Sequence, residues 1–270
     1  MNTDQGSAPL RNNSASLRKA LSILMRFGDD PSGEGYTITQ LSRDLDLNKS
    51  TIVRLMQPLL ETHFLEPGEA PGSYRLSWRN ARLGQTYLAS VRPDRDMHQV
   101  LLDLSSRTTE TSHLVRAATP YVVYIDKVDS PHSVRMVSRI GNTQAMYSTS
   151  VGKCILAHAD EEAVQAVLAE GMPARTPATI TTEEELRKEL ALIREQGWAI
   201  DDVENEDGIR CVAAPVFDAE GRCSHAISTS GPVSRVPRER VPQLVPLVTA
   251  AAADISRRMG APADRIRGAS

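Results

Sequence analysis

The chain has 270 residues, of which 40% are hydrophobic and 24% charged, and its formal net charge at pH 7 is −3. These values are typical of a globular protein, and they exclude a uniformly basic protein that coats nucleic acid regardless of sequence. Aromatic residues make up only 4% of the chain, which argues against single-strand binding by stacked rings. At about 150 residues per domain, the length predicts one large domain or two modest ones.

The three cysteines, at positions 154, 211 and 223, form no CxxC pair and no cluster with histidine. This spacing argues against a zinc ribbon, a disulfide scaffold and a thioredoxin-type motif, and we expect neither a metal nor a cofactor. The N-terminus is polar and lacks the apolar core of a signal peptide, and no apolar run approaches the roughly 18 residues that span a membrane. The sequence therefore predicts a cytoplasmic protein without a membrane segment.

Residues 1–14 are rich in Asn, Ser, Gly and Gln and predict a disordered arm. The following block, residues 15–78, predicts three helices and a hairpin. Apolar residues at helical spacing predict the first helix, and Thr39 and Asn48 are the expected N-caps of the second and third. Two short β-prone pieces that flank a Pro/Gly-rich turn predict the hairpin within residues 64–77.

The segment ITQLSRDLDLNKSTIVRLMQPL (residues 38–59) has the pattern of a helix, a tight turn and a second helix. Its apolar residues would pack together and leave the start of the second helix exposed, where a helix-turn-helix presents side chains to the major groove of DNA. Arg54 is long enough for a bidentate contact with guanine, and Arg43 and Arg75 would reach phosphates. The expected DNA-binding residues are Arg43, Lys49, Ser50, Thr51, Arg54 and Arg75.

The same pattern also fits a three-helix bundle with ordinary surface charges, although a hairpin directly after it favours a winged helix. A winged helix that binds protein instead of DNA is an alternative function. Pro58 is expected to kink or shorten the second helix. Residues 1–90 carry ten Lys and Arg against nine Asp and Glu, so a single module would neutralise few phosphates and bind weakly. We therefore expect at least a dimer.

Residues 79–92 predict a connecting helix, ended by Pro93. The pattern then changes over residues 93–260 and leaves a tail at 261–270 that we expect to be flexible. Helices are predicted at residues 96–107, 151–158, 161–169, 183–196 and about 242–259. Strands are predicted at residues 111–118, 121–128, 133–140, 209–217 and 223–230. Hairpin-like neighbours at both ends predict an α/β domain, of the α+β kind, built on a mainly antiparallel sheet.

Catalytic motifs are absent from the second half of the sequence. It holds no GxSxG nucleophile elbow, and TSVGK (149–153) is no phosphate-binding P-loop, because Cys154 follows the lysine. Cys211 lies in an apolar run without a histidine at a suggestive spacing, which is typical of a buried residue. We predict no catalytic residue, and a ligand-responsive hydrolase with Cys211 as its nucleophile is an alternative.

A polar set in the same half is better suited to binding a small organic acid. TSVGK opens a helix, so its backbone N–H groups would point at an anion such as a carboxylate. Asp201 follows a strand-like stretch, and Cys211 lies on the next strand. Ser228 and Ser230 alternate on a third strand, where both face one side. The same residues also fit an exposed strand face and a solvated turn, so the spacing leaves both interpretations open.

Several motifs together resemble the IclR-type transcriptional regulators. The motifs are SLRKALSILMRF, ITQLSRDLDLNKSTIVRLMQPLLE and YRL, followed by STSVGKCILA, REQGWAIDDVENEDGIRCVAAPVFDAEG, AISTSGPVSR and AAADISRRMG. The resemblance extends over about residues 16–260. It implies a winged helix-turn-helix, a linker helix that helps to dimerise, and a GAF-like effector-binding domain. It also implies homodimers or homotetramers that bind palindromic operators in double-stranded DNA under the control of a small carboxylate effector.

The resemblance further implies an effector site that combines the loop at Ser150 with an apolar wall. The expected effector-binding residues are Met136, Gln144, Met146, Ser150, Val151, Asp201, Ile209, Cys211, Ser228 and Ser230. Ser133 and Gln144 are polar where some members carry leucine, which favours a hydroxylated ligand such as a sugar acid. Met136 and Met146 would adapt to a ring, so an aromatic acid is the second ligand class.

Overall fold

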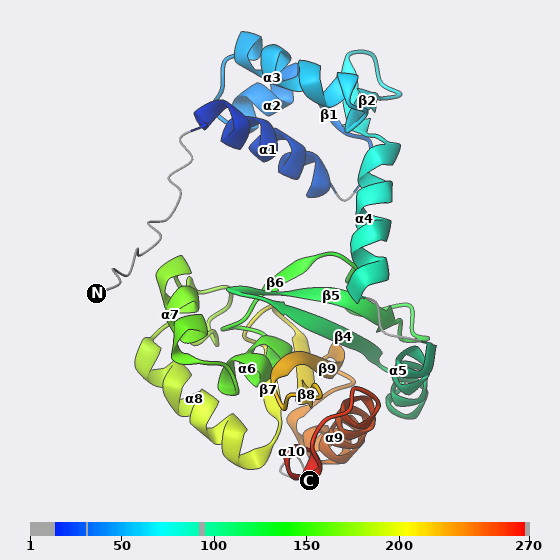
Figure 1. The fold of residues 1–270 in the computed structure, drawn as a ribbon, viewed down its shortest axis with the longest axis vertical. Helices are drawn as coiled ribbons and strands as arrows, with labels where there is room; N and C mark the ends of the chain where they lie inside the picture. The colour runs from blue at the N-terminus through cyan, green and yellow to red at the C-terminus, as the bar shows by residue number, and fades with distance from the viewer. Residues whose placement is uncertain (1–13, 31, 92–94, 268–270) are drawn as a thin grey trace, which may run out of the picture. The chain divides into compact units, whose positions relative to one another are not determined.

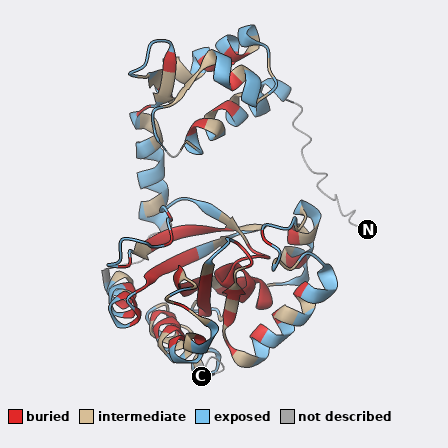
Figure 2. Ribbon diagram, turned by 180° about the vertical axis from the view of Figure 1, so that it is seen from behind, coloured by how far each residue is buried: buried red, intermediate tan, exposed pale blue. Residues whose placement is uncertain are grey.

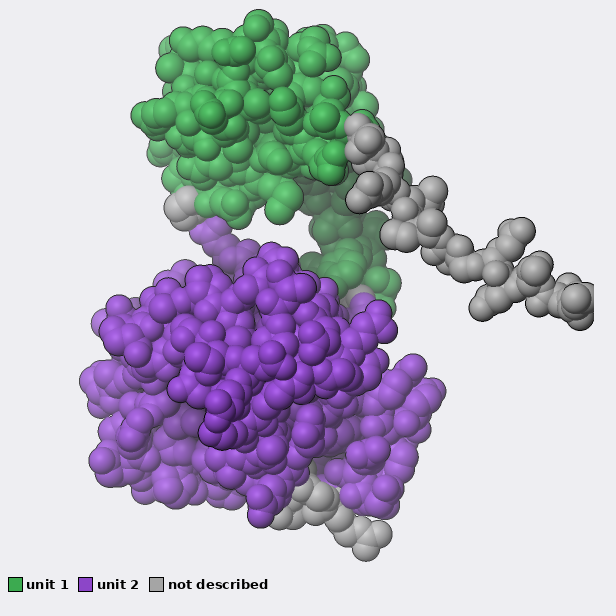
Figure 3. All heavy atoms as spheres, turned by 90° about the vertical axis from the view of Figure 1, so that its left-hand side faces the viewer, with its two compact units in different colours: residues 1–90 green, residues 91–270 purple. Residues whose placement is uncertain are grey.

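The structure, a computed structural model, describes residues 14–30, 32–91 and 95–267. The chain divides into two compact units, residues 1–90 and residues 91–270 (Figure 3). Almost all of the arm expected at residues 1–14, and the last three residues of the tail expected at 261–270, lie outside the described residues.

The first unit is a helical domain with a small sheet (Figure 1). Its elements are α1 (Ala15–Gly28), β1 (Tyr36–Thr37), α2 (Ile38–Asp44), α3 (Lys49–Glu61), β2 (Leu65–Pro67), β3 (Ser73–Leu76) and α4 (Trp78–Val91). The strands form an antiparallel sheet in the order β1-β3-β2, and the predicted hairpin of β2 and β3 follows α3 directly. The buried side chains of Ile23, Leu41 and Ile52 join α1, α2 and α3 in one core. This arrangement is a winged helix-turn-helix.

Capping residues set the starts of α2 and α3. The Gln40 N–H donates to the Thr37 hydroxyl over 3.3 Å, and the Thr37 N–H donates to the Gln40 side-chain oxygen over 2.8 Å. This capping box begins α2 at Thr37, so the prediction that Thr39 is the N-cap is wrong. Asn48 does occupy the N-cap position of α3, although its side chain makes no capping hydrogen bond. Pro58 does not shorten α3, which continues beyond it.

The second unit is a six-stranded antiparallel sheet with helices on both faces (Figure 1). Its strands, in the order β6-β5-β4-β9-β8-β7, are β4 (Thr111–Ala118), β5 (Tyr121–Val128), β6 (Thr143–Ala145), β7 (Ala199–Asp202), β8 (Ile209–Phe217) and β9 (Cys223–Pro232). Its helices are α5 (Arg95–Thr108), α6 (Ser150–Ala157), α7 (Glu161–Glu170), α8 (Glu183–Gln196), the 3-10 turn η1 (Arg238–Arg240), α9 (Val241–Arg258) and α10 (Ala263–Arg267). The short α10 lies in the tail that was expected to be flexible. The predicted fold class, a winged helix-turn-helix followed by a mainly antiparallel α+β domain, is confirmed.

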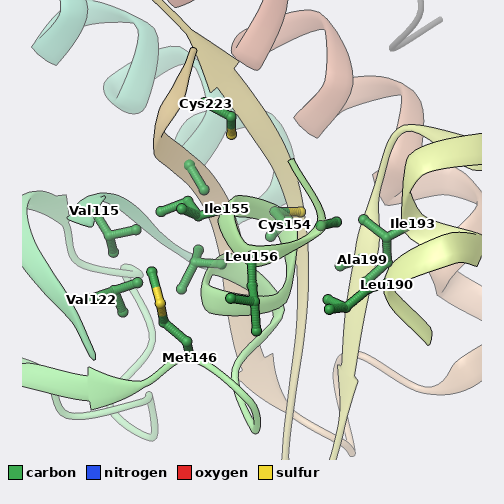
Figure 4. Close-up of a cluster of buried hydrophobic side chains, with 14 of the residues drawn as sticks. Val115, Val122, Met146, Cys154, Ile155, Leu156, Leu190, Ile193, Ala199 and Cys223 are labelled. Carbon is green, nitrogen blue, oxygen red and sulfur yellow. The ribbon is translucent and has the colours of Figure 1, made fainter. Parts of the chain in front are cut away.

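Two hydrophobic cores flank this sheet. On one face, Val115 and Val122 belong to a cluster with Ile155 and Leu156 of α6, joined by residues of α7 and α8 (Figure 4). On the other face, the apolar sides of α5 and α9 cover alternate strand residues such as Val212. Every residue of α6 is buried, and Figure 2 shows burial concentrated on the strands of this unit and on that helix. Burial on both faces explains why several of these strands are nearly continuous apolar runs.

The strand predicted at residues 133–140 is wrong, because this stretch of the described chain forms no regular strand. Instead, β5 pairs with the short strand β6. Within this stretch Met136 and Ser138 are buried, whereas Val134 and Val137 are exposed. Val134 has the same parity as Met136, so the apolar residues of the stretch do not share one buried face, and their spacing resembles a strand without its burial pattern.

Candidate functional site

The exposed side of α3 is the first candidate site. Ile52, Leu55 and Met56 are buried in the core of the first unit, which turns the opposite side of the helix to solvent. Of the predicted DNA-binding residues on this helix, Lys49, Ser50 and Arg54 are exposed and Thr51 is half-buried. Because Asn48 makes no capping hydrogen bond, the first N–H groups of α3 are open to solvent or an anion.

The basic residues of the first unit differ in whether they already have a partner. Arg43 pairs with Asp44 at 3.1 Å, and Arg75 pairs with Glu66 at 3.0 Å. Among the residues that the structure describes, Lys49 and Arg54 make no ion pair. These two side chains can bind a phosphate or a base without first giving up a carboxylate, whereas Arg43 and Arg75 must exchange one.

The second candidate site begins at the first turn of α6. Thr149 is the N-cap of this helix, and its hydroxyl accepts a hydrogen bond from the Gly152 N–H at 3.2 Å. Ser150 and Val151 occupy the first two positions of the helix and are buried. At these positions an N–H has no partner within the helix, so both point toward whatever lies at the helix start. A buried helix N-terminus of this kind attracts negative charge.

A polar row crosses the sheet on the face that α6 covers. Asp201 on β7 pairs in register with Cys211 on β8, and Cys211 pairs with Ser230 on β9. Ser228 lies two residues before Ser230 and therefore faces the same side. All four side chains are almost completely buried. We call these four residues the polar row; the structure brings together here residues that the sequence placed on three separate segments.

Asp201 is the only carboxylate of the polar row. Its Oδ1 accepts hydrogen bonds from the Glu204 N–H at 2.8 Å and the Asn205 N–H at 3.2 Å. Burial raises the pKa of this carboxyl to about 7, and the negative charge of Glu204 adds to the rise, while the two N–H bonds oppose it. At neutral pH, Asp201 can therefore exchange between an acceptor and a proton donor.

A buried ion cluster supports the loop after Asp201. The Lys153 ammonium, on α6, contacts Glu204 Oε1 at 2.6 Å and Glu189 Oε1 at 3.2 Å. Its side chain is completely buried, and the Glu204 side chain is only 8% exposed. The cluster fastens α6 to the loop that carries the hydrogen bonds of Asp201.

The remaining predicted effector residues lie around this region in different environments. Ile209, half-buried, begins β8 two residues before Cys211 and shares its face. Gln144 lies on the edge strand β6 opposite Val122, on the face of α6. Met146 is fully buried in the hydrophobic cluster of that face (Figure 4), and Met136 is buried in the irregular segment 133–140.

His113 is a residue that sequence reasoning missed. It lies on β4 in register with Ser228 and is 1% exposed, and its Nδ1 is 3.4 Å from the Ser230 hydroxyl. Burial, together with the positive charge of Lys127, lowers the pKa of its imidazole to about 3. The alternation of Thr111, His113 and Val115 indicated which side this histidine faces, but not that β9 is the neighbour.

The structure does not favour a reactive cysteine or a metal ion at this site. Burial and the nearby Asp201 raise the pKa of the Cys211 thiol well above its ordinary value, which disfavours the reactive thiolate. Within the described part of the chain, no group of His, Cys, Asp and Glu is arranged to hold a metal ion. None of the helices it contains has the length and apolar character needed to cross a membrane.

Comparisons with known proteins find matches to both units of the chain. The family model of the IclR helix-turn-helix domain matches residues 16–68, and that of the bacterial transcriptional regulator IclR C-terminal domain matches residues 85–257. The HTH-type transcriptional regulator KdgR of Escherichia coli is 36% identical over 248 residues, which cover 91% of this chain and 93% of KdgR. XynR of the same organism is 34% identical over 250 residues, covering 92% and 98%.

A solved structure has the same fold over nearly its whole length. The crystal structure of Thermotoga maritima IclR aligns with a TM-score of 0.68 at 33% identity, covering 91% of this chain and 98% of that protein. A winged helix-turn-helix joined to a domain of this kind defines a DNA-binding transcriptional regulator. The chain belongs to the IclR family of bacterial transcriptional regulators. Its relatives are named as regulators and not as enzymes, so a hydrolase is not favoured.

Proposed function

We propose that this regulator binds a palindromic operator as a homodimer or homotetramer and that a small carboxylate bound in the second unit controls that binding. The observation that carries the proposal is the buried polar row on the sheet face that α6 covers. Burying a carboxyl and two hydroxyls is costly unless their polar atoms are satisfied. Asp201 Oδ1 already accepts two backbone hydrogen bonds, and a polar organic ligand would satisfy Asp201 Oδ2 and the Ser228 hydroxyl.

On the DNA side, α3 would lie in the major groove with its first two turns against the bases. Lys49 and Arg54 would supply the charge that contacts phosphate and guanine, and Ser50 and Thr51 would supply hydroxyls. Arg43 and Arg75 would contact the adjacent backbone after exchanging their carboxylate partners for phosphates. A regulator that acts on chromosomal DNA in this way would work in the bacterial cytoplasm.

On the effector side, the N–H groups of Ser150 and Val151 would hold the carboxylate. The Ser230 hydroxyl would donate to the same carboxylate, and Ser228 and Asp201 would bind hydroxyl groups further along the ligand, since hydroxyls both donate and accept hydrogen bonds. This set favours a hydroxylated acid such as a sugar acid. An aromatic acid is the second ligand class, but Met146 belongs to the packed core and has less freedom to adapt to a ring.

Apolar residues on the surface of the first unit support self-association. Leu17, Leu21 and Met25 follow one side of α1 at intervals of four residues and are 47–70% exposed. Leu83 and Tyr87 are likewise exposed on α4, which contains most of the predicted connecting helix. Such stripes are typical of a helix that packs against another copy. Two weakly charged modules held together would gain the affinity that one lacks.

The effector would act by binding one state of the dimer more tightly than the other, since only differential affinity shifts such an equilibrium. Half-sites in an operator lie about one DNA turn apart or a multiple of it, so a small change in the spacing of two winged helices removes their register.

The DNA-binding half of the proposal is tested by Lys49→Ala with Arg54→Ala, measured by fluorescence anisotropy on DNA that flanks the protein's own gene. Specific binding should be lost while folding and oligomeric state are kept. The matched control, Arg18→Ala with Lys19→Ala, removes two exposed charges from α1 and should retain specificity. Equal affinity of the Lys49 and Arg54 variant and the wild type would refute the assignment of α3.

The effector half is tested by titrating the full-length protein with a panel of organic acids in a calorimeter, with D-gluconate and 4-hydroxybenzoate representing the two ligand classes. Heat of binding that disappears in Asp201→Asn is expected for at least one acid. A panel without heat and without thermal shift would contradict the proposal.

A further inference from the structure

The imidazole of His113 bridges two hydroxyl groups in the buried part of the second unit. Its Nε2 is 2.8 Å from the Ser138 hydroxyl, and its Nδ1 is 3.4 Å from the Ser230 hydroxyl. The first contact is a short hydrogen bond, and the second is near the outer limit of one. Tyr124 packs beside the ring with a centroid distance of 4.8 Å. The ring is therefore anchored to Ser138 and lies close enough to engage Ser230.

Ser138 is itself fixed in place. Its carbonyl oxygen accepts a hydrogen bond from the Lys127 ammonium at 2.7 Å, and Lys127 also pairs with Asp129 at 2.8 Å. The irregular segment that contains Ser138 is held at a second point, where Arg235 donates to the Val134 carbonyl over 2.9 Å. This segment thus brings a defined hydroxyl to Nε2.

The neutral imidazole offers one donor and one acceptor. The tautomer of His113 therefore decides whether the Ser230 hydroxyl offers a ligand its proton or only its lone pairs. When Nδ1 is an acceptor, Ser230 gives its only proton to His113 and presents lone pairs to the site. When Nδ1 carries the proton, Ser230 accepts from it. The Ser230 proton is then free to point into the site, where a carboxylate would accept it.

We propose that His113 is a positioning residue of the effector site, which donates from Nδ1 to Ser230, accepts at Nε2 from Ser138, and so directs the Ser230 hydroxyl proton toward the effector carboxylate. This inference rests on the proposed effector site. It adds a residue on β4, which lies outside the predicted set, and it connects the site to the segment that carries Ser138. It also requires that the effector place a hydrogen-bond acceptor, such as its carboxylate, near Ser230.

The test uses the full-length protein with D-gluconate and 4-hydroxybenzoate as probes, and it reads the tautomer from the nitrogen resonances of the His113 side chain. In the complex with whichever acid binds, Nδ1 should carry the proton and Nε2 should carry none. His113→Phe should weaken binding about tenfold or more, the factor that a hydrogen bond to a charged group contributes. His113→Asn, which retains a donor near the position of Nδ1, should recover most of the affinity.

Two further variants keep the test decisive if His113→Phe fails to fold. Ser138→Ala removes the donor to Nε2 and should weaken binding several-fold while lowering the population of the Nδ1–H tautomer. His225→Phe, on β9, replaces a histidine in register with Val216 of the opposite face and should leave the affinity unchanged. An Nε2–H tautomer in the complex, or unchanged affinity in both His113→Phe and Ser138→Ala, overturns the role of His113 alone. Wild-type protein that binds no acid of the panel overturns the effector half of the proposed function, and this inference with it.

Discussion

Replacing Lys153 with methionine tests whether the buried ion cluster holds the effector site together. Methionine keeps an unbranched apolar stem of similar length and removes only the ammonium group. That group is completely buried and lies 2.6 Å from Glu204 and 3.2 Å from Glu189. The variant therefore leaves two carboxylates close together without a cation.

The expected cost follows from the burial of Glu204. Its side chain is 8% exposed, burial already raises the pKa of its carboxyl, and its Oε2 has no hydrogen-bond partner among the described residues. Removing one partner of such a pair costs about 3–5 kcal/mol, because the other charge stays buried and uncompensated. For a unit of this size, this corresponds to a fall in Tm of roughly 6–20 °C.

Differential scanning calorimetry measures this fall, and a second substitution identifies its cause. Lys153→Met combined with Glu204→Gln should recover much of the lost stability, because the buried charge is gone as well. Lys188→Met is the matched control: Lys188 pairs with Glu184 on the surface of α8 and is 72% exposed, so about 0.5 kcal/mol or less is expected. A Tm for Lys153→Met within about 2 °C of wild type would refute the reasoning.

Two more predictions concern the same site, and the first has a control substitution on α4 of the first unit. A Cβ at Gly152 would lie 2.4 Å from Met146 Cα and 2.5 Å from its carbonyl oxygen, so Gly152→Ala should lower the unfolding free energy by about 1–3 kcal/mol, measured by denaturant unfolding. Gly84→Ala, where the Cβ meets open space on α4, should instead stabilise by up to about 1 kcal/mol. The folded-state pKa of Asp201 is raised to about 7. The protonated Asp201 therefore makes its full contribution to the free energy of unfolding below about pH 4, and this contribution is lost as the pH rises to 7. Relative to Asp201→Asn, wild type should lose up to about 1.4 kcal/mol per pH unit across that window, and parallel stability curves would contradict the raised pKa.

Much of the fold could be predicted because burial imposes a period on the sequence. The strands at 111–118, 121–128 and 209–217 and the helix at 183–196 begin and end where the apolar pattern does. The strand at 133–140 was wrong because its apolar residues have the spacing of a strand, although Val134 and Val137 are exposed and the stretch forms no strand in the described chain. An apolar pattern alone does not report whether the side chains are buried or whether the backbone is paired.

The N-cap of α2 was missed for a different reason. The spacing of Thr37 and Gln40 matches a capping box, and the sequence contains this signal, whereas Thr39 is a residue type typical of N-caps that lies inside the first turn of α2. Reciprocal hydrogen bonds, and not proximity to the first apolar residue, decide where a helix begins.

The candidate effector site could be predicted in part. Asp201, Cys211 and the pair Ser228 and Ser230 were named on three separate segments, and the resemblance to a family assigned them to one site. The role of His113 could not be predicted, because it depends on which strand lies beside β9 and on the register of that pair. Strand order in an antiparallel sheet is set by packing across long loops, and a single sequence carries little information about it.

The most direct test of ligand-controlled DNA binding is a footprint of the full-length protein on the DNA that flanks its own gene, with and without the panel of organic acids. The account predicts two protected half-sites about one helical turn apart or a multiple of it, with protection that changes when one acid is added to the wild type and does not change in Asp201→Asn. Absence of protection, or protection that no acid in the panel alters, would contradict it.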